Sequence, residues 1–350
     1  MSSLADRLLW LCSIPSPTGE EHALSEAIAE RLAQERPGAK VRKHGRSLVV
    51  PLGSEAGAIV LAGHLDTVRS EPMAPVRREG DRIYGCGASD MKAGLALMMH
   101  LSATGRELPV TLVFYAGEEG PYAGNELERV LRDDDGVKAA SFAVCLEPSD
   151  NELQLGCCGT LHARVTFSGT SAHSARPWQG DNAIHKAGPL LLELSSCEPR
   201  WVEHDGLRYA TVTSATMASG GSGRNVVPGL FEVNVNHRFG PGTSIAQARA
   251  EVESLVGGRA AVEFVDEAPS ALPHRGHEAV RALESSGVRG VSAKQAWTDV
   301  ARFEEHGIAG ANFGPGIAAQ AHQRGEWASV KELEVGWEIL NRWLRVGCAG

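Results

Sequence analysis

Seven side chains of the kinds that bind divalent metals or move protons are spread over most of this 350-residue sequence. They are His64, Asp66, Asp90, Glu118, Glu119, Glu147 and His322. Short apolar runs lead directly into His64, into the Glu118-Glu119 pair and into Glu147. Imidazole and carboxylate groups suit a zinc ion, or a related divalent ion, in a hydrolytic site that keeps one coordination position open. The pattern therefore indicates a metal-dependent hydrolase.

The positions of these groups carry more weight than their types. In a chain with 13 His and 43 acidic residues, a His-x-Asp pair or a Glu-Glu pair by itself is expected on solvated loops. A charge at the end of a buried strand is costly to desolvate, so a chance scatter of acids would not fall there repeatedly. In an open α/β sheet, ligands bind at the carboxyl ends of the strands. Neighbouring buried strands must therefore position the site.

The order of the patterned segments predicts an α/β fold whose mainly parallel sheet is covered by helices on both faces. Helical periodicity over 20–35 and 93–104 alternates with strand patterns, as such a sheet requires. Parallel strands buried on both faces are continuous apolar runs, and 58–62 and 110–116 have that composition. We expect the seven side chains at the carboxyl ends of these strands.

The middle of the chain has a different character. From about residue 159, segments such as 160–168 and 229–239 alternate apolar and polar side chains, which is typical of antiparallel strands with one solvated face. We expect a separate α+β domain over 159–273. His322 can join the earlier ligands only if this domain is inserted into the first one. The catalytic domain is therefore predicted to be discontinuous, over 1–158 and 274–350.

Composition excludes several classes of partner. The 43% of hydrophobic residues is ample for two packed cores, and the net charge of -9 at pH 7 argues against nucleic acid or an anionic membrane. No apolar run reaches the length of a membrane span, and the first fifteen residues lack the pattern of a signal peptide. The seven cysteines show no CxxC spacing, which favours reduced thiols in a cytoplasmic protein.

Competing chemistries fit the sequence poorly. The Gly85-Cys86-Gly87 loop resembles the start of a dinucleotide fingerprint, but Asp90 occupies the third glycine position and would repel a pyrophosphate. No Gly-x-Ser-x-Gly motif is present, and no cysteine has an evident base beside it. A water activated by metal remains.

Five motifs, taken in order, resemble the M20 metallopeptidase and deacylase family. They are Gly63 to Val68, Tyr84 to Gly94, Gly117-Glu118-Glu119, Leu146-Glu147-Pro148, and Gly314-Pro315-Gly316 followed by Ala321-His322. The resemblance extends from about residue 10 to the C-terminus. It implies hydrolysis of an amide bond with two zinc ions, for which Co²⁺ or Mn²⁺ are alternatives, and a homodimer formed through the inserted domain.

The resemblance also implies a role for each group. His64 and Glu147 would hold one zinc ion, Glu119 and His322 the other, and Asp90 would bridge them, with its bond to Met91 in the cis form. Glu118 would be the general base. Asp66 would orient the His64 imidazole from behind.

Residues of the inserted domain and of the last segment would contact the substrate. His173 would reach the active site of the partner subunit and stabilise the oxyanion, assisted by Asn225 and Arg238. Arg176 and Arg302 are candidate contacts to the substrate, because arginine binds carboxylates in a bidentate fashion. Thr298 and the amides of Gly314 and Gly316 are further candidates. A surface ion pair is an equal alternative for Arg176 and Arg302.

Within the family, several segments favour a branch that removes the succinyl group from N-succinyl-L,L-diaminopimelate. They are Gly169 to Pro177, Gly180 to Lys186, Arg224 to Pro228, Asn236 to Phe239 and Trp297 to Phe303. The expected substrate is thus a small N-acyl amino acid. Another N-acyl amino acid deacylase, such as N-acetylornithine deacetylase, and a di-zinc peptidase remain alternatives. A non-catalytic metal-binding scaffold is disfavoured, because Glu118 and all five expected ligands are present.

Overall fold

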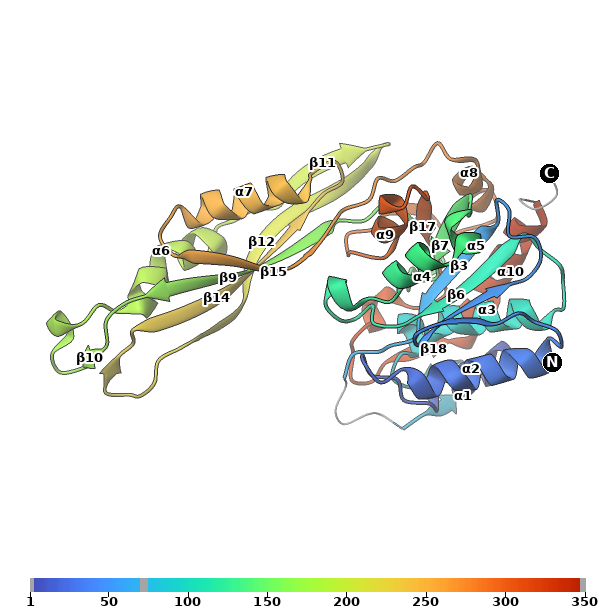
Figure 1. The fold of residues 1–350 in the computed structure, drawn as a ribbon, viewed down its shortest axis with the longest axis horizontal. Helices are drawn as coiled ribbons and strands as arrows, with labels where there is room; N and C mark the ends of the chain where they lie inside the picture. The colour runs from blue at the N-terminus through green and yellow to red at the C-terminus, as the bar shows by residue number, and fades with distance from the viewer. Residues whose placement is uncertain (1–2, 70–74, 347–350) are drawn as a thin grey trace. The chain divides into compact units, whose positions relative to one another are not determined.

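A computed structural model describes residues 3–69 and 75–346 (Figure 1). The chain forms two compact units. The first takes its residues from Met1–Gly156, Pro273–Lys294 and Thr298–Gly350, and the second from Cys157–Leu272 and Gln295–Trp297. The second unit is therefore enclosed, in sequence, by the parts of the first.

The first unit is built on an eight-stranded sheet in the order β1-β2-β6-β3-β7-β17-β8-β16. Its four central strands are β6 (Val110–Tyr115), β3 (Ile59–His64), β7 (Phe142–Cys145) and β17 (Gly310–Asn312), and they run parallel. Every residue of these strands is buried, as a parallel sheet covered on both faces requires. The predicted α/β fold with a mainly parallel sheet is confirmed.

The edges of this sheet depart from the parallel pattern. On one side β2 (Ser47–Pro51) is antiparallel to β6, and β1 (Arg42–His44) is antiparallel to β2. On the other side β8 (Leu153–Leu155) is antiparallel to β17, while β16 (Val291–Ala293) is parallel to β8. A small antiparallel sheet joins β4 (Arg77–Glu79), β5 (Arg82–Tyr84) and β18 (Trp327–Ser329).

Two groups of helices pack on the first sheet (Figure 1). The apolar helix α3 (Ala93–Ala103) packs on β3 and is contacted by α1 (Leu4–Cys12), α2 (His22–Glu35) and α10 (Val330–Val346). A second group comprises α4 (Leu127–Asp133), which contacts β1 and β2, and α9 (Val300–Glu305), which contacts β7 and β17. The remaining helices of this unit are η1 (Ala88–Lys92), η2 (Tyr122–Gly124), α5 (Asp135–Lys138), α8 (Glu278–Glu284) and η4 (Ala318–Gln320).

The second unit is a five-stranded antiparallel sheet with two helices on one face (Figure 1). In the order β11-β12-β14-β9-β15, its strands are Arg200–His204, Leu207–Gly220, Leu230–Phe239, Gly159–Ser168 and Ala261–Ala268. The helices α6 (Ala183–Ser195) and α7 (Ile245–Val256) bury their apolar sides against alternate residues of β9 and β14. A short ribbon pairs β10 (Ala172–His173) with β13 (Val226–Val227), and η3 (Pro177–Gln179) follows β10.

Within residues 3–69 and 75–346, no helix has both the length and the apolar character that a membrane crossing needs. The six cysteines in this part of the chain are not joined in disulfide bonds. Cys348 lies outside the described residues.

Candidate metal centre

The carboxyl ends of the central strands bring together the ligands expected from the sequence. His64 is the last residue of β3, while Glu118 and Glu147 follow shortly after the ends of β6 and β7. His64, Asp90 and Glu119 each place one ligand atom within 4.8 Å of the others. Such a group of imidazole and carboxylate atoms can hold a divalent ion.

Asp90 lies between the two imidazoles. Its Oδ1 is 3.2 Å from His64 Nε2, and its Oδ2 is 3.6 Å from His322 Nε2. His322 Nε2 is also 2.9 Å from Glu119 Oε1. The peptide bond between Asp90 and Met91 is cis, as the family resemblance implied. The two oxygens of the Asp90 carboxylate therefore lie near different imidazoles, an arrangement that suits a bridge between two ions.

Glu147 provides a test of whether a cation fits. Its side chain is only 5% exposed, and its Oε1 is buried without a hydrogen-bond partner among the described residues. Burial raises the pKa of Glu147 to about 7, and the charge of Asp90 acts in the same direction. A buried carboxylate oxygen without a donor is unfavourable, and a divalent ion would satisfy it. The residues present therefore fit a metal ion.

Asp66 contacts both the His64 imidazole and the loop that follows β6. Its carboxylate accepts hydrogen bonds from the backbone N–H groups of Gly117, Glu118 and Glu119 over 2.9 to 3.1 Å. His64 Nδ1 is 2.9 Å from the backbone carbonyl of Asp66, but 3.7 Å from its carboxylate. Asp66 thus orients the imidazole through its main chain, and its side chain fixes the loop that carries Glu118 and Glu119.

The side chain of Glu326 fixes the segment that carries Asp90, as that of Asp66 fixes the loop after β6. Glu326 was not among the residues predicted from the sequence. Its carboxylate accepts from the N–H groups of Gly87, Ser89 and Asp90 over 2.7 to 2.9 Å. Its side chain is buried, and burial raises the pKa of Glu326 to about 7. The one available signal was an acid directly before the short apolar run of β18.

Two glycines let a third loop pack directly against these segments. A Cβ on Gly314 would lie 2.4 Å from the Glu147 carbonyl oxygen, and a Cβ on Gly316 would lie 2.2 Å from the Ser89 carbonyl oxygen. The Gly314 N–H donates to Ser149 Oγ over 2.9 Å. The Gly314 amide is thus engaged within the protein, unlike the substrate contact expected for it. Both glycines set the spacing between the ligand-bearing loops.

Glu118 is partly buried and lies among other acidic side chains. Burial raises the pKa of Glu118 well above its ordinary value, and the neighbouring charges of Glu147, Glu119 and Asp299 add to the shift. Bound cations would oppose that shift. A carboxylate whose proton affinity depends on its surroundings is suited to proton transfer.

Arg302 and Thr298 lie in the protein interior. Arg302 is 2% exposed and donates to Asp299 Oδ1, Glu128 Oε2 and the Tyr122 carbonyl over 2.8 to 3.2 Å. Thr298 is also buried, and its carbonyl accepts from the Ala301 N–H. These partners favour a structural role for Arg302 over the substrate contact that the sequence suggested.

The other expected residues belong to the second unit. His173, Arg176 and Asn225 lie near one another, because β10 pairs with β13 and the Ser174 N–H donates to the Asn225 carbonyl. All three are exposed. Arg238, near the end of β14, donates to Asn236 Oδ1, and burial lowers the pKa of its guanidinium.

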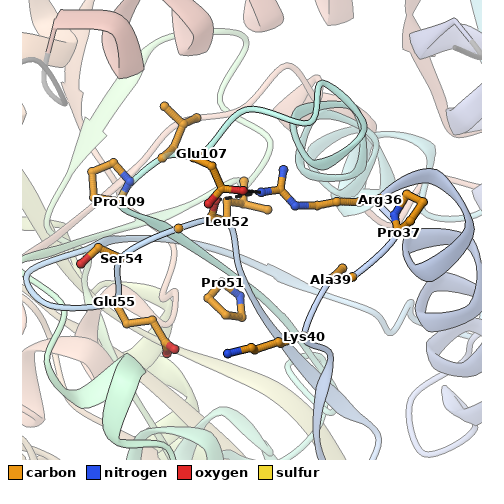
Figure 2. Close-up of a pocket in the computed structure, with 13 residues that line it drawn as sticks. Arg36, Pro37, Ala39, Lys40, Pro51, Leu52, Ser54, Glu55, Glu107 and Pro109 are labelled. Carbon is orange, nitrogen blue, oxygen red and sulfur yellow. Dashed lines mark hydrogen bonds and ion pairs between the residues drawn. The ribbon is translucent and has the colours of Figure 1, made fainter.

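A surface pocket of about 580 Å³ lies away from this chemistry (Figure 2). Its walls include Leu108 and Pro109, which directly precede β6, so it opens at the amino ends of the parallel strands. Arg36 reaches into it, yet donates to Glu107 and to the backbone carbonyls of Leu52 and Arg106. We assign this pocket to the packing of loops.

The sequence matches the model of the peptidase family M20/M25/M40 over residues 60–346. The chain belongs to this family. It is 38% identical over 338 residues to a protein of Mycobacterium tuberculosis named, provisionally, succinyl-diaminopimelate desuccinylase DapE, with 95% of this chain and 96% of that protein covered. It is 35% identical over 346 residues to a succinyl-diaminopimelate desuccinylase of Corynebacterium glutamicum, covering 95% and 94%.

Solved structures show the same fold at lower identity. A tripeptidase from Staphylococcus aureus has a TM-score of 0.80 at 19% identity, covering 99% of this chain and 98% of that one. A metallo-carboxypeptidase of the M20 family from Sulfolobus solfataricus has a TM-score of 0.78 at 15% identity, covering 99% of each.

The Glu326 contacts generate a test of how the site is held. Glu326→Gln places an NH2 group against backbone donors, so we expect the free energy of unfolding to fall by about 1 to 3 kcal/mol and metal to be held less tightly. Denaturant titrations with and without zinc measure both effects. Glu334→Gln, the same change at an exposed position of α10, is the control. Equal behaviour of the two variants would contradict this role of Glu326.

Proposed function

We propose that this protein removes the succinyl group from N-succinyl-L,L-diaminopimelate by metal-dependent hydrolysis, in the biosynthesis of diaminopimelate and lysine. The observation that carries the proposal is the 38% identity to a relative of that name over nearly the whole of both chains. The clustering of His64, Asp90 and Glu119 supports it, since amide hydrolysis needs a polarised carbonyl and an activated water.

We infer that two zinc ions occupy the site, one held by His64 and Glu147 and the other by Glu119 and His322, with Asp90 shared. The two oxygens of Asp90, each on the side of a different imidazole, support this division. When bound, the ions polarise the carbonyl of the scissile amide and lower the pKa of a water molecule.

The chain's own residues would then move the proton. Glu118 accepts it from the attacking water and passes it to the departing amine. Three backbone N–H groups, including that of Glu118, donate to the Asp66 carboxylate and so fix the Glu118 backbone. The Glu118 carboxylate therefore stays beside the metal ligands without being a ligand itself. A positioned base of this kind contributes about 100- to 10,000-fold to the rate.

The second unit of one subunit would supply a side chain to the active site of the other subunit. The Ala175 N–H donates to His173 Nδ1 over 3.1 Å, so the neutral imidazole carries its proton on Nε2 and exposes it as a donor. We propose that this donor, assisted by Asn225 and Arg238, stabilises the oxyanion in the other subunit of a homodimer. Arg176 would be available to a substrate carboxylate.

The surface of the second unit supports dimer formation. Beyond Thr211, the outer edge of β12 has no strand partner in the described part of the chain. Leu192 on α6 is 69% exposed, and Met217 on β12 is 73% exposed. An unpaired strand edge beside exposed apolar side chains is a surface that a second copy can cover.

Substrate comparison tests the activity itself. We expect zinc-loaded protein to hydrolyse N-succinyl-L,L-diaminopimelate in preference to N-acetylornithine and to tripeptides. Glu118→Gln should lower kcat by at least about 100-fold, because a neutral amide cannot accept the water's proton. Preferential cleavage of N-acetylornithine or of tripeptides would reject the proposed substrate and select one of the rival activities.

Metal content provides a second test. We expect about two zinc ions per chain, and Asp90→Ala should weaken both sites because it removes a ligand that they share. Elemental analysis and titration against a zinc chelator measure stoichiometry and affinity. Asp135→Ala, at an exposed position of α5, is the control. Loss of only one ion from Asp90→Ala would contradict a bridging role.

Mixed dimers test the role of His173. Neither His173→Ala nor Glu118→Gln alone should be active, but mixing them should restore up to about a quarter of wild-type activity. Random pairing gives heterodimers in half of the cases, and each has one site with both an intact base and an intact borrowed imidazole. Absence of recovery, once subunit exchange has been demonstrated, would mean that His173 does not act across the dimer.

A further inference from the structure

A buried lysine lies beside the metal ligands without an evident purpose. Lys294 directly follows β16, and its backbone N–H donates to the Leu155 carbonyl over 3.1 Å. Its side chain is only 8% exposed. Nζ donates to the carbonyl of Pro148, the residue after Glu147, over a long distance of 3.4 Å. An ammonium group has three donors, so within residues 3–69 and 75–346 this contact leaves most of its hydrogen-bonding capacity unused.

The charge of Lys294 reaches the proposed metal ligands. Burial raises the pKa of Glu147, and Lys294 is among the cations that oppose this shift. Burial also acts against ionisation of Asp90, yet His64, His322 and Lys294 together hold the pKa of Asp90 below its ordinary value. The position of the ammonium group, at the carbonyl of the residue that follows Glu147, agrees with this electrostatic effect.

Metal binding would change the electrostatic surroundings of Lys294. Two divalent ions balance the charges of four carboxylates, those of Asp90, Glu118, Glu119 and Glu147. The acids that attract Lys294 are then neutralised, and its positive charge remains in a largely buried place. A buried charge without a counter-ion is unfavourable, so the loaded site favours an additional anion close to Lys294.

We propose that Lys294 is a specificity residue that binds a carboxylate of the substrate. The inference rests on the proposed function, in which the substrate is an N-acyl amino acid with carboxylates on both the acyl and the amine side. Lysine suits this contact because its ammonium is a compact charge with several donors. Lys294 lies next to Pro148, so the carboxylate would bind on the Glu147 side of the metal ligands.

Direct binding measurements test the proposal without turnover. The probes are succinate and its uncharged diamide, succinamide, titrated calorimetrically into zinc-loaded full-length protein. A hydrogen bond to a charged group contributes about 1.5 to 3 kcal/mol, so Lys294→Met should weaken succinate binding by about 10- to 100-fold. Succinamide binding should stay unchanged. Lys294→Arg should retain most of the succinate affinity, because it keeps the charge.

Matched variants separate this role from a structural one. Lys138→Met removes one positive charge from an exposed position on α5 and should leave succinate binding unaltered. Lys294→Gln, which keeps polarity without charge, replaces the Met variant if that protein does not fold. Equal succinate affinity in wild type and in a folded, zinc-loaded uncharged variant overturns the proposal. So does a change of zinc affinity with succinate affinity retained, since Lys294 would then act on the metal alone.

Kinetics identify which substrate carboxylate is bound. With N-succinyl-L,L-diaminopimelate, Lys294→Met should raise KM by about 10-fold or more and change kcat little. An analogue with the succinyl carboxylate converted to an amide should show no such difference between wild type and variant if Lys294 binds the acyl end. If the difference persists, the bound group is on the amine side. Absence of turnover by wild-type protein would reject the proposed function, whereas the succinate titration would still decide the role of Lys294.

Discussion

Hydrogen bonds from backbone amides to two buried carboxylates hold the whole candidate site together. Three successive N–H groups converge on Asp66, and three from another segment converge on Glu326. The ligand set itself is acidic and self-repelling, so it would spread apart if side chains alone determined its geometry. Because main-chain groups fix both loops, the carboxylates of Asp90, Glu118 and Glu119 stay close even though their charges oppose it. A cation then meets a site that is already arranged.

The sequence was most informative where strand periodicity and residue type coincide. His64, Glu118 and Glu147 follow apolar runs, and the rule that parallel strands present their carboxyl ends at one edge was enough to bring them together. His322 was included for its residue type, but its pairing with Glu119 was implied only by the family resemblance, because its loop has no periodicity. Its Nε2 lies 2.9 Å from Glu119 Oε1, across a long separation in the chain.

Functions of acids and glycines that depend on main-chain partners could not be predicted. Asp66 was expected to orient the His64 imidazole. Its main-chain carbonyl lies 2.9 Å from His64 Nδ1, and its carboxylate oxygens accept hydrogen bonds from the backbone amides of residues after β6. Gly314 was expected to present its amide to a ligand, whereas that N–H donates to Ser149 Oγ. A Cβ on Gly314 or Gly316 would meet the backbone carbonyl oxygen of Glu147 or Ser89. Backbone approach of this kind leaves no periodic signal, so residue type alone misassigns the contact. The interior position of Arg302 was likewise not evident from its residue type.

The distance in sequence between Glu326 and the segment it fixes has a consequence for biosynthesis. Residues 87–90 leave the ribosome long before Glu326 and His322 are made, and within the described chain the carboxylate that accepts hydrogen bonds from those three amides is that of Glu326. Contacts of such large sequence separation form late in folding. A nascent chain therefore lacks the contacts that order Asp90, so the candidate metal site takes shape only after the C-terminal segment has been synthesised.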